Sequence, residues 1–155
     1  MNNLRHETIY DIIKNRFAPL LTHDNFDLVT VIPDNVYTTL PNVDWLRDMV
    51  INDAIIAPEL KKYRNEIFDC DDFVMYLKTK VSLRIANTSS YPYPVAVGYI
   101  ITERHAFNFG VLDDNRLFIL NTQSDDVGHI IPSNHNDTIS FMKLTKINVI
   151  KNIYI

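Results

Sequence analysis

The apolar positions of the chain follow a helical spacing in the first half and an alternating spacing in the second. After Asp69, apolar residues recur four, three and four positions apart, at Cys70, Val74, Leu77 and Val81. This spacing is typical of an amphipathic helix with one buried stripe. Aspartate is a favoured N-cap residue, because its carboxylate accepts N–H bonds from the first turn. We therefore expect a helix that begins at the only cysteine of the chain.

Two earlier segments also have helical patterns. Residues 7–21 place their apolar side chains on one helical face, and residues 42–54 begin at Asn42, another favoured cap. Between them, residues 26–32 are rich in apolar and β-branched side chains and precede the turn signal at 33–35. The first half is thus predicted to be mainly helical, with one extended segment.

Strand patterns dominate after residue 94. Residues 95–101, 105–111 and 116–121 each favour a strand, a turn is expected at 113–115, and residues 141–155 alternate well enough for one or two more strands. Helices followed by neighbouring strands indicate an α+β fold, with the N-terminal helices packed on a C-terminal antiparallel sheet. The length of 155 residues fits a single domain that spans the chain.

Composition and charge narrow the function classes. With 46% hydrophobic and 22% charged residues, the chain has the composition of an ordinary globular protein. A net charge of −4 without a basic cluster argues against a nucleic-acid partner. No apolar run is long enough to span a membrane, and the first residues lack the apolar core of a signal peptide. A single cysteine excludes an internal disulfide and is consistent with a reducing, cytoplasmic compartment.

The position of Cys70 gives it two interpretations. In the first turn of a helix, a thiol lies at the positive end of the helix dipole, which favours the thiolate. Free cysteines are also among the most buried residues, so a structural cysteine is the alternative.

Two polar residues downstream favour the reactive interpretation. If the strands around the 113–115 turn pair as a hairpin, His105 and Asn121 approach each other across it. A thiol nucleophile needs a base within hydrogen-bond reach and a third polar group that orients the base. Each residue alone also fits a structural role. Together with Cys70 they supply a nucleophile, a base and an orienting group.

The runs Phe68-Asp69-Cys70-Asp71-Asp72-Phe73 and His105-Ala106-Phe107-Asn108 resemble the papain-like cysteine protease domains. The similarity is to the domain at the C-terminus of a Marasmius mushroom agglutinin and to related bacterial and phage domains, and it covers roughly residues 34–123. The resemblance implies a papain-like fold with Cys70 as nucleophile and His105 as base. It also makes a virion-associated setting an alternative to the cytoplasm.

The third catalytic position departs from the agglutinin pattern. Asn121-Thr122-Gln123 stands where the agglutinin has Glu-Pro-Gln, and papain itself uses an asparagine there. For the oxyanion, the Cys70 backbone N–H is one expected donor. Asn65 and Gln123 are the candidate side-chain donors.

The resemblance also implies calcium. The agglutinin protease is calcium-dependent and uses adjacent aspartates as ligands, which makes Asp71 and Asp72 candidate Ca²⁺ ligands here. Without a cation, two carboxylates beside Cys70 oppose a thiolate. The alternative is that both carboxylates are solvated or cap the helix.

We therefore expect a thiol hydrolase that cleaves peptide or other amide bonds of a peptide or protein substrate through Cys70, His105 and Asn121. A cell-wall amidase of the NlpC/P60 kind is a second enzymatic interpretation, although that family prefers Ser-Gly after the cysteine and this chain has Asp-Asp. A papain-like scaffold without catalysis, acting as a binding or structural protein, is the non-enzymatic alternative.

Overall fold

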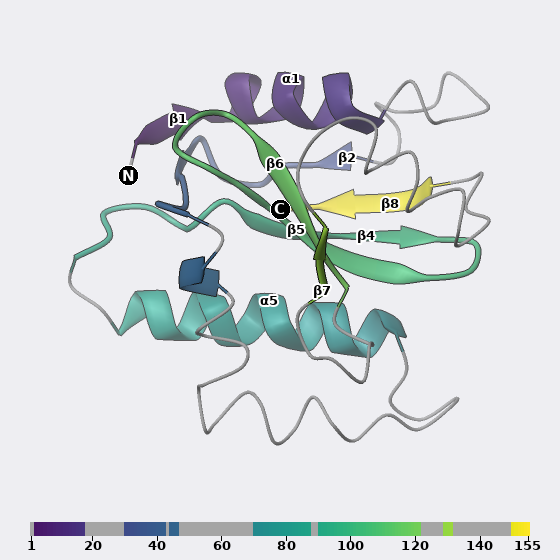
Figure 1. Ribbon diagram of the computed structural model, residues 1–155. Helices are drawn as coiled ribbons and strands as arrows, with labels where there is room; N and C mark the ends of the chain where they lie inside the picture. The colour runs from purple at the N-terminus through teal and green to yellow at the C-terminus, as the bar shows by residue number, and fades with distance from the viewer. Residues whose placement is uncertain are drawn as a thin grey trace.

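The computed structural model describes residues 2–17, 30–42, 44–46, 70–87, 90–121, 129–131 and 150–155. Within these ranges, a six-stranded sheet lies between two helices, one on each face (Figure 1). The expected α+β class is therefore confirmed, with the helices divided between the two faces.

The main sheet contains strands from both halves of the chain. Its strands are β2 (Thr30–Val31), β4 (Val97–Thr102), β5 (Ala106–Val111), β6 (Leu117–Asn121), β7 (His129–Ile131) and β8 (Ile150–Tyr154). Their order is β2-β8-β4-β5-β6-β7. The strands predicted in the second half pair antiparallel, as expected. Strand β7 also pairs antiparallel, but it lies in the polar segment 123–136, which has the composition of a loop and for which no strand was predicted.

The sheet differs from the expected antiparallel one at β2, which pairs parallel with β8. These two strands lie at opposite ends of the sequence, and a local pattern of apolar residues does not specify such a distant partner. A separate two-stranded sheet joins β1 (Asn3–Arg5) to β3 (Val36–Thr38).

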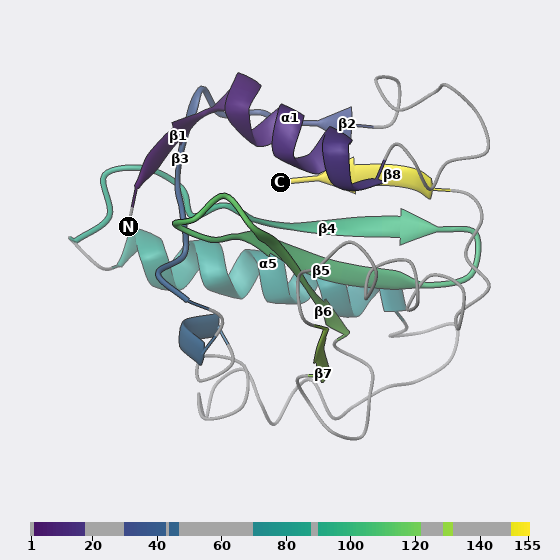
Figure 2. The same ribbon diagram turned by 45° about the horizontal axis from the view of Figure 1, so that its top comes forward.

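The two helices pack against opposite faces, as Figures 1 and 2 both show. Helix α1 (His6–Phe17) forms the core of one face, where Phe17 packs against Phe107 and Phe109 of β5. Helix α5 (Cys70–Ala86) covers the other face, where Phe73 and its neighbours meet Phe118 of β6. Successive residues of a strand point to opposite faces, which lets one sheet serve both cores.

Local sequence signals account for two further features. The predicted turn at 113–115 is present, with Asn115 at a φ of 63°, a left-handed conformation that asparagine tolerates better than most residues. The Asn42 cap is also present, because Oδ1 of Asn42 accepts a hydrogen bond from the Trp45 N–H at 2.9 Å. Only residues 44–46 of that helix are described. No helix in the described part of the chain is long and apolar enough to cross a membrane.

Candidate active site

Helix α5 begins at Cys70, as predicted from the spacing of its apolar residues. Its buried residues are Phe73, Val74, Leu77, Val81 and Ile85. Cys70 is a free cysteine and is half-buried, at the edge of this stripe rather than inside the core. The residue therefore retains access to solvent at the N-terminus of a long helix. Asp69, the expected N-cap, lies outside the described residues.

A buried asparagine fixes the position of α5 on the sheet. Asn108 lies in β5 and is completely buried. Its Nδ2 donates hydrogen bonds to the backbone oxygen of Val74 at 3.0 Å and to that of Gly98 at 3.1 Å. Its Oδ1 has no hydrogen-bond partner among the residues that the structure describes. One side chain thus joins the second turn of α5 to the two central strands β4 and β5.

This joint places Cys70 and His105 at the same edge of the molecule. Helix α5 and strand β5 run in the same direction (Figure 1). Cys70 lies four residues before Val74 in the helix, which corresponds to roughly 6 Å along the helix axis. His105 lies three residues before Asn108 in extended chain, which corresponds to roughly 10 Å along the strand. The start of α5 and the start of β5 therefore lie near each other.

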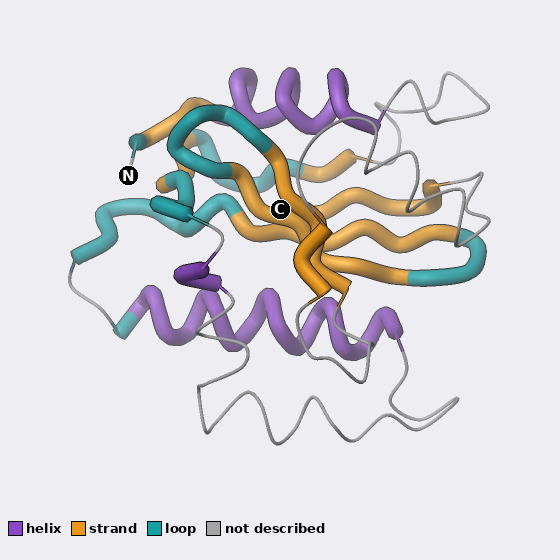
Figure 3. The backbone as a smooth tube through the Cα atoms, in the orientation of Figure 1, coloured by secondary structure: helices purple, strands orange, loops and turns teal. Residues whose placement is uncertain are grey.

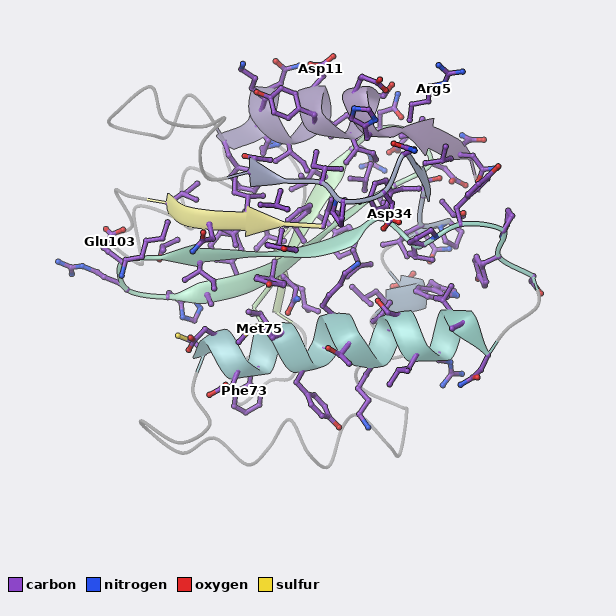
Figure 4. The ribbon with its side chains drawn as sticks, turned by 180° about the vertical axis from the view of Figure 1, so that it is seen from behind. Arg5, Asp11, Asp34, Phe73, Met75 and Glu103 are labelled. Carbon is purple, nitrogen blue, oxygen red and sulfur yellow. The ribbon has the colours of Figure 1, made fainter. Side chains whose placement is uncertain are left out.

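Figure 4 shows this edge from behind: Glu103, in the turn between β4 and β5, lies at the same end of the molecule as Phe73, in the first turn of α5. Figure 3 shows that turn as the short loop that joins the two strands.

The backbone of His105 is held by Thr102, a residue that no sequence pattern marks as part of the site. The His105 N–H donates to Thr102 Oγ1 at 2.9 Å, and the Thr102 hydroxyl and N–H both donate to the His105 carbonyl oxygen, at 2.6 and 2.9 Å. These hydrogen bonds between Thr102 and His105 close the turn between β4 and β5, directly before β5 begins. His105 is half-buried, and its ring centroid lies 6.5 Å from that of Phe107.

Asn121 is the last residue of β6, and the register carries it toward the start of β5. Asn108 is paired with Leu120, so the next residue of β6 comes opposite Phe107, two positions from His105. On its other side, Asn121 is paired with His129 of β7. The expected hairpin of β5 and β6 is confirmed, and the contact between the His105 and Asn121 side chains stays a prediction.

The two carboxylates beside the cysteine occupy the first turn of α5. Asp71 and Asp72 are both half-buried. Calcium takes six to eight oxygen ligands, and the described residues contain no group of three or more His, Cys, Asp or Glu that would hold a metal ion. The described part of the chain therefore does not complete a calcium site on its own. The oxyanion candidates Asn65 and Gln123 lie outside the described residues.

Comparison with known proteins identifies the fold. No family model and no curated protein matches the chain. Among solved structures, one described as "PSL1a-E64 complex" matches with a TM-score of 0.70 and 18% sequence identity. The match covers 99% of this chain and 51% of that one, so the chain spans about half the length of this structural neighbour. The likeness confirms the expected α+β papain-like fold.

Proposed function

We propose that this protein is a papain-like thiol hydrolase that cleaves peptide or other amide bonds with Cys70 as its nucleophile. The observation that carries the proposal is the arrangement of three chain positions: Cys70 starts α5, His105 precedes β5, and Asn121 ends β6, the strand paired with β5. The structural neighbour was solved with the protease inhibitor E64, which supports a thiol site on this fold. The resemblance to the agglutinin protease domain points the same way.

The proposed reaction has two stages. The Cys70 thiolate attacks the carbonyl carbon, the scissile C–N bond breaks, and the His105 imidazolium delivers its proton to the leaving amine. This leaves a thioester between Cys70 and the acyl group. His105 then takes a proton from water, the resulting hydroxide attacks the thioester, and the acid product leaves as the thiolate is restored.

The other groups hold the reacting atoms in place. Asn121 is proposed to orient the imidazole, as the third member of a triad does. The backbone N–H of Cys70 is proposed as one donor to the oxyanion, with Asn65 or Gln123 as the second. The N-terminus of α5 adds about half a positive elementary charge near the sulfur, which favours the thiolate.

Replacing His105 with alanine is expected to slow alkylation of Cys70 by iodoacetamide at neutral pH by about tenfold or more, because the partner cation of the thiolate is lost. Asn121→Ala should slow it less, since that residue only orients the ring. The measurement is the rate of mass increase of the folded protein across pH. His6, a half-buried histidine on α1 with 43% of its side chain accessible, supplies the control His6→Ala, which should react like wild type. Equal rates in all four proteins would favour the scaffold without catalysis.

Calcium is expected to raise both the melting temperature and the alkylation rate of Cys70, with EDTA reversing both. The proposed ligands Asp71 and Asp72 place up to two negative charges within one helical turn of the sulfur, and a bound divalent cation would offset them. Asp71→Asn and Asp72→Asn should each weaken the response, whereas Asp11→Asn, at an exposed position of α1, should not. A melting temperature that is constant up to millimolar Ca²⁺ would leave the aspartates with a capping role only.

A further inference from the structure

A concave site lies along α5, apart from the proposed catalytic residues. It is a cleft of about 720 Å³ between the helix, the segment before β4 and the adjacent strands β4 and β8 of the sheet. Neither Cys70 nor His105 lines it. Figure 4 looks onto this part of the molecule, with Met75 on α5 and Asp34 on the loop above it, both of which line the cleft. The volume is in the range of small-molecule sites, which is roughly 300–1,000 Å³.

The wall of the cleft carries one lysine among its lining residues. Lys78 projects from α5 and is half-buried. Its ammonium makes no hydrogen bond or salt bridge to the residues that the structure describes. Burial lowers the pKa of Lys78 to about 8, and the Coulombic effect of Asp34 opposes this lowering only in part. A cation withdrawn from water without a partner is costly, so an anion in the cleft would be stabilised there.

Flat aromatic surfaces line the same space. Tyr99 of β4 and Tyr154 of β8 stack with their ring centroids 5.5 Å apart and their planes within 6°. Tyr91 and Tyr93 line the cleft from the segment before β4, and Tyr93 is 41% exposed. Such rings bind a planar apolar group by stacking and by burial of its surface. The cleft therefore combines one cation with several aromatic rings.

We propose that this cleft binds a small organic anion with a planar aromatic body, its acidic group at Lys78 and its ring against the tyrosines. The site is separate from the proposed hydrolase residues and does not depend on their function. Asp34 is exposed and also lines the cleft, where its carboxylate repels an anion. The two charged residues should thus act on ligand affinity in opposite directions.

The test uses two dyes of similar shape, 8-anilino-1-naphthalenesulfonate, which is an anion, and N-phenyl-1-naphthylamine, which is uncharged. Lys78→Gln should weaken binding of the sulfonate by about tenfold, the scale of one charge-assisted contact, and leave the neutral dye within about twofold. Asp34→Asn should strengthen binding of the sulfonate. Lys80→Gln is the matched control on the same helix, because Lys80 lies over the Tyr76 ring and does not line the cleft.

A pH series separates Lys78 from the other groups that face it, which are Asp34 and the four tyrosines of the cleft. The Lys78 ammonium is charged below its pKa of about 8, so affinity for the sulfonate should fall as pH rises through this value. Burial raises the pKa of Tyr99, away from this range. Lys78→Arg should flatten the profile, because a guanidinium keeps its charge. Unchanged sulfonate affinity in Lys78→Gln, or equal weakening of both dyes, would overturn the proposal.

Discussion

Replacing Cys70 with serine is expected to reduce peptide hydrolysis by more than about a thousandfold while the protein stays folded. A serine hydroxyl at this position lacks the acidity of a thiol, so the helix dipole and a neighbouring histidine do not convert it into an anion. Cys70 is half-buried at the first residue of α5, where a serine fits in size and in its preference for helix starts. The measurement is cleavage of fluorogenic peptides, with the melting temperature recorded on the same samples.

The alternative hypothesis, in which Cys70 is a structural core residue, predicts the opposite result. If the thiol were a core side chain, Cys70→Ser would lower the melting temperature markedly, and the wild-type protein would show no hydrolysis to lose. Cys70→Ala separates the two further, because it removes the sulfur without adding a hydroxyl. A folded and inactive alanine variant beside an active wild type would support the proposed nucleophile.

Asn108→Asp is expected to destabilise the protein by about 3 kcal/mol or more at neutral pH. The wild-type Nδ2 donates to the carbonyl oxygens of Val74 and Gly98 at 3.0 and 3.1 Å, in a completely buried position. An aspartate would place a carboxylate oxygen against two carbonyl oxygens and bury an unpaired charge. The loss should appear as a lower free energy of unfolding in urea.

Two further measurements test whether this loss of stability comes from the side-chain amide of Asn108. Asn108→Leu removes the donors without adding charge and should cost less than the aspartate, about 1–3 kcal/mol. The loss of unfolding free energy in Asn108→Asp should become smaller below about pH 5, because a protonated carboxyl group regains one hydrogen-bond donor. An aspartate variant as stable as wild type at neutral pH would show that this side chain does not hold α5 on the sheet.

Local patterns in the sequence were enough to predict the elements that carry the candidate site. The helix at Cys70 follows from the regular spacing of Val74, Leu77 and Val81, because these side chains form one continuous buried stripe. The hairpin of β5 and β6 follows from two apolar runs around the turn that contains Asn115. In each case the signal and the structure it specifies lie within a few residues of each other.

The features that depended on distant contacts were not predictable in this way. The parallel pairing of β2 with β8 joins Thr30 to Ile153. The division of the helices between the two faces also depends on tertiary packing. Asn108 stands inside the apolar strand Ala106–Val111, where a buried polar residue is a signal, but its partner Val74 lies 34 positions away. The cleft around Lys78 is assembled from four separate parts of the chain.

The measurement that tests the central proposal most directly is the mass of the folded protein after incubation with E64, with papain treated in parallel. The proposal predicts one inhibitor added per chain, mapped by digestion to Cys70, the only cysteine. The addition should slow markedly in His105→Ala and stay unchanged in His6→Ala. A wild-type protein that remains unmodified at Cys70 while papain reacts to completion would contradict the assignment of Cys70 as a thiol nucleophile.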